Sequence, residues 1–257
     1  MRFLADRQII ELSGNDRNIF LQNLITNDLN EIREKRILHT FFLNHLGKII
    51  FEFYIHESSE SLLIDCNKES THELIKRLML YKLRSKITIK IREDLGVYWT
   101  KSKLNFPLDP RNKKMGYRGI NDKESISDQN KEPDYEQMRI NLAIAEINKD
   151  FLSLNIFSHE LNDYDKSISH IKGCYPGQEI VSRIYHKKVK SKRIFYPFRY
   201  SGKPGEMGDK ISYQNREIGL LGSKSDKFIL ACVNRNLATA SFYINNLELI
   251  KMEYIEK

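Results

Sequence analysis

The spacing of apolar residues along the first part of the chain predicts both strands and helices. Short apolar or alternating runs predict strands, and these lie at residues 7–12, 39–43, 49–55, 61–65 and 96–100. Apolar residues three and four positions apart predict helices at residues 19–25, 70–81 and 134–146. Gly47 lies between two of the strands, in a segment typical of a β-hairpin turn. This part of the chain is therefore expected to mix sheets and helices.

The pattern changes near residue 192. Short β-rich runs then alternate with turn signals such as Lys203-Pro204-Gly205, which is typical of a small all-β domain that closes into a barrel. We therefore predict an α+β protein with a mixed body over residues 1–186, built as one domain or two packed subdomains, and a C-terminal β-barrel over residues 187–257. The polar residues 121–133 contain no glycine and are expected to form an exposed connection.

The run from Lys172 to Glu179 has a composition that a plain core segment does not need. It joins a lysine, a thiol, an aromatic ring, two glycines, a proline, an amide and a carboxylate. Apolar residues between positions 180 and 184 predict an amphipathic helix directly after it. Pro176 suits the first position of that helix, because its missing N–H would be unpaired there. Cys174 is then expected just outside a helix N-terminus.

The position predicted for Cys174 favours a reactive thiol. A helix N-terminus stabilises negative charge, and Lys172 stands two residues away, so this thiol is expected to ionise more readily than a free cysteine. The alternative is a small buried hydrophobic residue, the commoner role of a lone cysteine. The other two cysteines, Cys66 and Cys232, are far away in the sequence, which argues against a disulfide framework. No Cys/His cluster has metal-ligand spacing, so no permanently bound metal is expected.

The run resembles the signature of a known family. Its fixed positions are lysine, glycine, cysteine, tyrosine, any residue, glycine, glutamine and glutamate, with Pro176 in the variable position. This string resembles that of the YgfZ family of folate-binding proteins, which are related to the glycine-cleavage T-protein, an aminomethyltransferase. The resemblance implies a folate-binding body with a small C-terminal barrel. It also implies tetrahydrofolate as the cofactor, with a polyglutamylated form included, and a role in assembling or repairing iron–sulfur clusters of client proteins.

The resemblance also implies roles for single residues. Cys174 is the functional thiol, with Lys172 beside it; Tyr175 packs against the pteridine or its aryl group, and the backbone at Gly173 and Gly177 approaches the ligand closely. Hydrogen bonds to the pterin ring are expected from the polar pair Gln178 and Glu179. Two arginines at family positions, Arg118 and Arg139, are expected to bind the cofactor. Arg118, together with Arg111, is expected to meet its acidic tail, and the alternative for both is to pin a loop to its own backbone.

Glu52 carries the rival interpretation, a true enzyme. The T-protein has a catalytic aspartate shortly after the hairpin glycine, and the matching position here is Glu52. A carboxylate near a folate nitrogen shuttles a proton in tetrahydrofolate-dependent one-carbon transfer from an amine or sulfur donor. The glutamate is one methylene longer than the aspartate of the T-protein, which favours the assembly role, and the alternative for Glu52 is a solvent-facing position on a strand.

Charge and chain ends give the remaining expectations. The formal charge of +8 favours anionic partners, and the densest basic stretch is residues 186–193. Nucleic acid is a third possibility, but this stretch lacks the interleaved aromatic residues of a stacking platform. No apolar run approaches the length of a membrane span, and residues 1–7 have no apolar signal core. These features lead to the expectation of a cytoplasmic protein whose partners are folate and iron–sulfur client or assembly proteins.

Overall fold

The computed structural model describes residues 1–123, 134–213, 216–237, 242–244 and 247–251, and the polar connection predicted at residues 121–133 lies mostly outside them. The chain forms two compact units, one comprising Met1–Glu132 with Asp165–Ser182, and the other Pro133–Tyr164 with Arg183–Lys257. Both units are discontinuous in sequence. The expected boundary at residue 186 is close to the last crossing between units, but residues 133–164 group with the C-terminal sheet, which the sequence does not predict.

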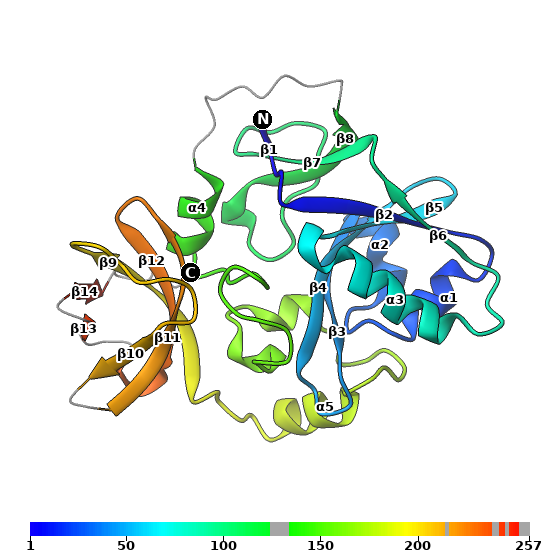
Figure 1. Ribbon diagram of the computed structural model, residues 1–257. Helices are drawn as coiled ribbons and strands as arrows, with labels where there is room; N and C mark the ends of the chain where they lie inside the picture. Colours follow the sequence, from blue (N-terminus) through cyan, green and yellow to red (C-terminus); the bar gives the residue numbers. More distant parts are fainter. Residues whose placement is uncertain (124–133, 214–215, 238–241, 245–246, 252–257) are drawn as a thin grey trace. The chain divides into compact units, whose positions relative to one another are not determined.

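The first unit contains two antiparallel sheets (Figure 1). The larger has the strand order β3-β4-β5-β2-β6 and the smaller the order β1-β7-β8. The strands are β1 (Arg2–Phe3), β2 (Arg7–Ser13), β3 (Ile37–Leu43), β4 (Ile49–Glu57), β5 (Ser61–Asn67), β6 (Thr88–Arg92), β7 (Leu95–Thr100) and β8 (Tyr117–Asp122). The helices are α1 (Arg17–Gln22), α2 (Ile32–Lys35), α3 (Thr71–Lys82) and α5 (Gln178–His186), and the boundary between units falls inside α5. The strands and helices predicted before residue 100 are therefore confirmed, with small shifts at their ends.

The five-stranded sheet has two different faces, because successive side chains of a strand point to opposite sides. Leu38, Phe53 and Ile64 belong to the main hydrophobic core, which also contains buried residues of α1 and α3. The residues next to them, His39 on β3 and Asp65 on β5, therefore lie on the opposite face. That face is buried too, so it holds polar groups that must find partners within the protein.

The second unit is built on one six-stranded antiparallel sheet, with the order β10-β11-β12-β9-β14-β13. Its strands are β9 (Arg193–Tyr200), β10 (Lys210–Tyr213), β11 (Arg216–Ser225), β12 (Phe228–Asn234), β13 (Phe242–Ile244) and β14 (Leu247–Lys251). Among the described residues no hydrogen-bonded pairing joins the edge strands β10 and β13, so the sheet is open. The closed C-terminal barrel expected from the sequence is not confirmed, because alternating strands and turns predict a sheet without determining whether its edges join.

One helix is shorter than predicted. The helix expected at residues 134–146 is α4 (Tyr135–Asn141), and its first turn is capped by Asp134, whose side chain accepts a hydrogen bond from the N–H of Glu136. Ala143 then takes a left-handed backbone conformation with φ of 53°. The helix ends there because a right-handed helix cannot continue through a residue with positive φ.

Candidate functional site

Lys172 anchors the run from Lys172 to Glu179, called the signature loop below. Its ammonium group donates hydrogen bonds to the carbonyl oxygens of Gln22 (2.5 Å), Ile25 (2.7 Å) and Asn27 (2.9 Å). Gln22 is the last residue of α1, and Ile25 and Asn27 lie in the segment just after it. The last carbonyl groups of a helix have no partner within the helix, so a cation placed here satisfies one of them together with two carbonyl groups of the following segment. Burial lowers the pKa of Lys172 to about 8, and the nearby carboxylate of Asp28 opposes this shift. The lysine predicted to stabilise the thiolate thus holds the loop to α1.

Gly177 fixes the other end of the signature loop against the turn between β3 and β4. It has φ of 82°, and a Cβ atom placed on it would lie 2.4 Å from the carbonyl oxygen of Asn44. That separation is far below a normal contact, so only glycine fits this approach. Gly173 differs, because a Cβ atom there would meet no atom within 4 Å. The two glycines of the loop therefore have unequal structural requirements.

Cys174 is exposed, whereas the other two cysteines are buried. Burial raises the pKa of Cys66 to about 11 and that of Cys232 to about 12, which suppresses the reactive thiolate in both. The alternative of a buried structural role for Cys174 is therefore wrong. Pro176 is predicted to be the first residue of helix α5, but the helix begins two residues later, at Gln178. The left-handed Gly177 stands between them and delays the helix.

The remaining side chains of the signature loop have mixed environments. Tyr175 is buried, its ring centroid lies 5.4 Å from the ammonium nitrogen of Lys172, and burial raises its pKa to about 12. The amide of Gln178 donates to the carbonyl of Lys172 at 3.4 Å, and Glu179 is exposed in the first turn of α5. Tyr175 and Gln178 thus contribute to the loop itself, while Cys174 and Glu179 face outward.

Glu52 lies on the buried polar face of the five-stranded sheet, so its expected alternative as a solvent-facing residue is wrong. Its carboxylate is 2.8 Å from Nε2 of His39, and Nδ1 of the same ring is 2.6 Å from the hydroxyl of Ser167. Burial lowers the pKa of His39 and outweighs the opposing effect of Glu52, which favours a neutral ring. The chain of groups resembles a hydrolase triad in order, but all three side chains are buried.

The contact between His39 and Ser167 links the segment before the signature loop to the five-stranded sheet. Ser167 also contributes its carbonyl oxygen, which accepts a hydrogen bond from the hydroxyl of Thr26 at 2.7 Å. Neither His39 nor Ser167 is predicted as a site residue from the sequence. A histidine inside the apolar strand 37–43 is a usable signal of a buried polar face, whereas nothing in the local sequence marks Ser167.

Arg118 belongs to a buried ion cluster on the same face. It extends from β8 and lies 2.7 Å from the carboxylate of Asp65, which Arg7 also contacts at 2.7 Å. The guanidinium of Arg118 stacks 4.0 Å from the ring centroid of Tyr54. Burial alone would raise the pKa of Asp65, but Arg118 and Arg7 outweigh it and hold this pKa well below its usual range. These contacts are structural, like the alternative role predicted for Arg118. They differ in detail, because Arg118 ties β8 to a carboxylate instead of tying a loop to its own backbone.

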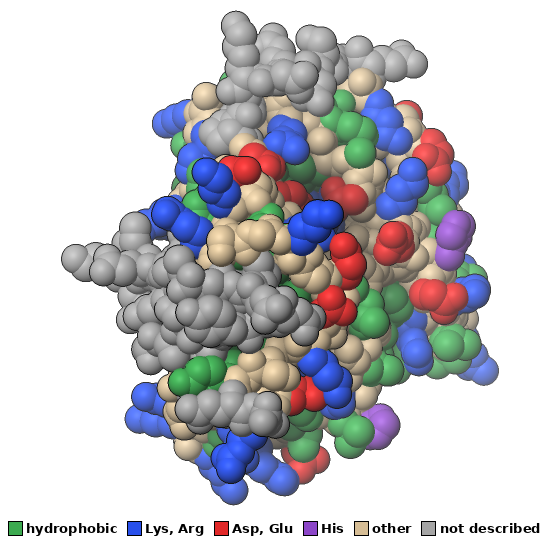
Figure 2. All heavy atoms as spheres, turned by 60° about the vertical axis from the view of Figure 1, so that its left-hand side comes forward, with side chains coloured by type: hydrophobic (Ala, Val, Ile, Leu, Met, Phe, Trp, Pro, Cys, Tyr) green, Lys and Arg blue, Asp and Glu red, His purple; other side chains and the backbone are tan. Residues whose placement is uncertain are grey.

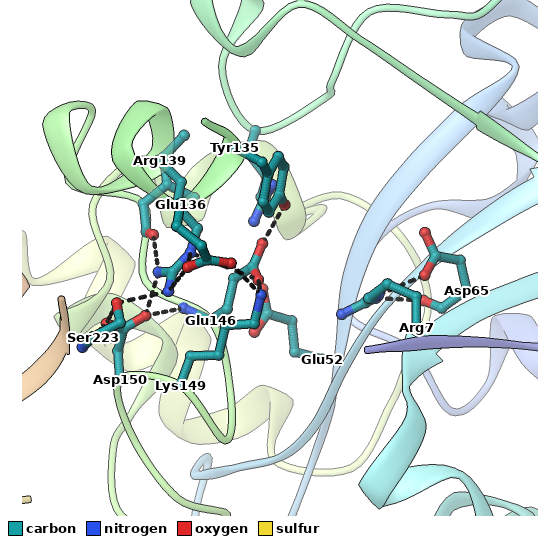
Figure 3. A network of polar contacts seen from close by, with 12 residues as sticks. Arg7, Glu52, Asp65, Tyr135, Glu136, Arg139, Glu146, Lys149, Asp150 and Ser223 are labelled. Atoms are coloured by element: carbon teal, nitrogen blue, oxygen red, sulfur yellow. Dashed lines mark hydrogen bonds and ion pairs between the residues drawn. The ribbon is translucent and has the colours of Figure 1, made fainter. Parts of the chain in front are cut away.

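Arg139 is equally buried, in the second unit (Figure 3). It donates to Asp150 and to Ser223, both at 2.6 Å, and it pairs with Glu136 on the same helix. Asp150 in turn accepts hydrogen bonds from the N–H and hydroxyl of Ser223. This network joins α4 to β11, which explains why residues 133–164 belong to the C-terminal unit.

The two arginines predicted to bind tetrahydrofolate, Arg118 and Arg139, have their charges satisfied by buried carboxylates. An acidic tail would therefore have to replace internal ion pairs, which is costly in a buried environment. Among the described residues no group of three or more His, Cys, Asp or Glu side chains is arranged to hold a metal ion.

The fold as a whole matches a solved enzyme structure. The chain superimposes on the glycine cleavage system aminomethyltransferase T from Bartonella henselae with a TM-score of 0.71, covering 99% of this chain and 85% of that one. Sequence identity over the match is 8%, so this comparison establishes the fold alone. The predicted mixed α+β architecture, with a body like that of the T-protein, is confirmed.

Sequence comparison points to a more particular group of relatives. The chain is 30% identical over 226 residues to the mitochondrial iron–sulfur cluster assembly factor IBA57 homolog of Neurospora crassa, and 29% identical over 216 residues to that of Pyricularia oryzae. It is 25% identical to the human iron–sulfur cluster assembly factor IBA57. These matches cover 74%, 74% and 77% of this chain, but 52%, 55% and 65% of the relatives. The chain thus spans between about half and two thirds of their length.

These findings leave one expectation unconfirmed and contradict another. No family model matches the chain, so membership of the YgfZ family itself is not confirmed. The relatives are named as mitochondrial proteins, which contradicts the cytoplasmic location expected from the sequence. In the part of the chain that the structure describes, every helix is too short or too polar to cross a membrane.

Proposed function

We propose that this protein acts in the assembly or repair of iron–sulfur clusters, with Cys174 as the thiol that contacts the cluster. The observation that carries the proposal is the contrast among the three cysteines. Cys174 is exposed on a loop whose ends are fixed by Lys172 and Gly177, while the other two thiols are buried. A fixed, accessible thiol suits brief contact with a cargo. The named function of the relatives supports the same role.

The chemistry of a cluster implies that Cys174 works with other ligands. A thiolate is a soft ligand that binds iron well, but clusters are commonly held by four such groups. Among the described residues the other two cysteines are buried, and no group of three or more His, Cys, Asp or Glu side chains is arranged to hold a metal ion. The cluster is therefore a substrate in transit, and its remaining ligands would come from the client or from another assembly protein. Lys172 and Gly177 act on the position of the thiol and not on the cluster itself.

Rescue of cells that lack this protein tests the proposal. The measurement is the activity of an iron–sulfur enzyme after return of the native chain, Cys174→Ser or Cys232→Ala. Serine preserves the size of the side chain but is a poor ligand for iron, so we expect Cys174→Ser to fail. Cys232→Ala removes a buried thiol and is expected to restore activity, provided its thermal midpoint shows that it folds. Equal rescue by Cys174→Ser and the native chain would exclude a role for this thiol.

Tetrahydrofolate binding is a separate proposal that rests on the fold. Its support is the likeness to an aminomethyltransferase. The two arginines predicted to bind the cofactor, Arg118 and Arg139, add no support, because they form internal ion pairs. Calorimetric titration of the purified protein with tetrahydrofolate, and separately with its polyglutamylated form, measures the affinity for each directly. Tighter binding of the polyglutamylated form would identify a basic site other than Arg118 and Arg139. The rival one-carbon transfer activity gains no support from Glu52, whose carboxylate is buried against His39.

A further inference from the structure

A groove of about 960 Å³ lies beside the signature loop, within the first unit. Its walls come from α1, from the segment that follows α3, and from the loop itself. Ile19 and Phe20 contribute from α1, Tyr81 and Leu83 from the end of α3 and the residue after it, and Pro176 from the loop. The groove therefore joins three segments that are far apart in the sequence.

Large apolar side chains stand exposed at this groove. Ile19 is 66% exposed and Leu83 is 88% exposed, although each would gain free energy by leaving water. Tyr81 makes an edge-type ring contact with the core residue Phe42, with centroids 5.7 Å apart, and is itself exposed. Contiguous exposed apolar side chains on a folded protein mark a surface that another molecule covers.

Leu83 is held in an unfavourable backbone conformation as well. It follows the last residue of α3 with φ of 41° and ψ of −111°. Side chains larger than hydrogen rarely adopt this region, and glycine is the residue usually found where a helix ends with positive φ. A leucine that is both strained and exposed contributes little to folding. Such a residue is a candidate for a role in binding.

Positive charge borders the groove. Arg84 lines it, and Lys82 and Lys86 are its neighbours in the chain. None of the three forms an ion pair with a carboxylate of the described residues. Asp16 also lines the groove, but it accepts a hydrogen bond from the N–H of Lys86 at 2.6 Å, so it serves the local fold. The border is thus complementary to an occupant that carries negative charge. On the face shown in Figure 2, by contrast, basic and acidic side chains are interspersed.

The groove is close to the exposed thiol. Pro176 lines the groove, and Cys174 is two residues away, so their Cα atoms lie within about 7 Å of each other. An occupant of the groove would therefore place its neighbouring residues within reach of Cys174.

We propose that this groove docks an amphipathic segment of a partner protein, with apolar side chains that cover Ile19 and Leu83 and carboxylates that face Arg84 and Lys86. The partner delivers or receives the cluster at Cys174, and in this respect the inference rests on the proposed function. Apolar anchors surrounded by charged groups are the usual arrangement of a protein–protein contact.

Other occupants match the groove less well. A bilayer surface is flat and does not enter a concave groove between a helix and a loop. A polyglutamate tail would pair with Arg84 but has no apolar groups to cover Leu83. Nucleic acid needs aromatic platforms for its bases, and Tyr81 is the single aromatic residue exposed among those that line the groove.

A matched pair of glycine substitutions separates docking from folding. Leu83→Gly removes an apolar anchor and relieves backbone strain, so the variant is expected to be as stable as the native chain or more so. Leu154→Gly makes the same change at an exposed leucine with φ of 66° that belongs to the second unit and is not among the residues that line the groove. We expect Leu83→Gly to lose rescue of iron–sulfur enzyme activity while Leu154→Gly keeps it. Equal rescue by both variants would overturn the docking proposal.

Cross-linking identifies the occupant without relying on rescue. A photoreactive residue at position 19 is introduced into the full chain, and the protein cross-linked in cells is identified with its attached peptide. We expect a peptide with apolar and acidic residues, and a cross-link yield that falls at least tenfold with Leu83→Gly or with Arg84→Glu and Lys86→Glu combined. Cross-links to lipid, to nucleic acid or to a second copy of this chain would overturn the proposal.

The two proposals fail in different ways. If Cys174→Ser rescues as well as the native chain while Leu83→Gly does not, the thiol function is wrong and docking stands. If Cys174→Ser fails but Leu83→Gly rescues fully, the thiol function stands and docking at this groove is wrong.

Discussion

At the scale of single residues, burial divides the three cysteines into one accessible thiol and two protected ones. Cys66 belongs to the main core of the first unit, and Cys232 lies on β12 of the second. Composition and spacing do not show which of the three cysteines are buried, because a cysteine by itself carries no sequence signal of its burial. The signature around Cys174 distinguishes it in the sequence, and the structure supplies the physical difference.

Alkylation of the native protein should therefore be selective. With iodoacetamide at neutral pH, we expect modification at Cys174 long before Cys66 or Cys232, whose thiols are buried and have raised pKa values of about 11 and 12. Mass spectrometry of the digested protein measures each rate. Reaction of Cys66 at a similar rate would contradict the burial of that thiol. A rate at Cys174 no faster than in an unfolded peptide would show that this thiol is not activated.

Lys172 is predicted to matter for stability as well as for the loop. Lys172→Met keeps most of the apolar stem but leaves the carbonyl groups of Gln22, Ile25 and Asn27 without their donor. Unsatisfied buried acceptors are costly, so we expect a loss of about 2–4 kcal/mol in the free energy of unfolding. Urea denaturation measures it. Lys187→Met, at an exposed lysine just after α5, is the matched control and should change stability by less than about 0.5 kcal/mol.

At the scale of elements, the signature loop depends on how α5 starts. The apolar spacing after residue 179 predicts this helix correctly, but Pro176 suggests a start two residues too early. The difference arises from a tertiary contact, since Gly177 approaches the hairpin turn at Asn44 and takes a left-handed conformation to do so. Local propensity does not include that contact.

The two loop glycines give a sharp comparison. Gly177→Ala places a Cβ atom 2.4 Å from a backbone oxygen in a left-handed conformation, and we expect a loss of about 2–4 kcal/mol in stability from strain and overpacking. Gly173→Ala meets nothing within 4 Å and is expected to lose less than about 0.5 kcal/mol. Thermal or urea unfolding of both variants provides the measurement. Equal losses would show that the loop is not held by the close approach at Asn44.

At the scale of the whole molecule, each unit has its own buried ionic centre. In the first unit Asp65 connects β5 with Arg7 on β2 and Arg118 on β8, and so joins the two sheets. In the second unit Arg139 connects α4 with β11 through Asp150 and Ser223. Arg118 and Arg139 are predicted as ligand contacts because the sequence shows their family positions but does not show their buried partners.

Acid should weaken the first unit through Asp65. Its folded pKa lies well below the ordinary value of about 3.9, so the unfolded chain binds its proton first as the pH falls. The stabilisation is complete well above pH 4 and is lost progressively below about pH 5. We expect the urea midpoint to fall steeply between pH 5 and pH 3.

Asp65→Asn identifies the source of that pH dependence. The variant leaves two buried guanidinium groups without a carboxylate, and we expect it to lose about 3–5 kcal/mol at pH 7 and to show a flatter decline in acid. Asp122→Asn, at an exposed position on β8, is the control and should follow the native curve. If the stability of Asp65→Asn declined in acid as steeply as that of the native chain, the acid sensitivity would belong to other carboxylates.

The sequence by itself determined the elements of this protein and the place of its most informative loop. Apolar periodicity is local, so strands such as β2 and helices such as α3 follow from neighbouring residues. Only the tertiary structure decided which polar groups meet. His39 joins Glu52 on the neighbouring strand and Ser167 far along the chain, Arg118 joins Asp65, and Lys172 joins the end of α1. Buried polar groups need partners, but the sequence does not say which, because pairing depends on how distant strands and loops are brought together.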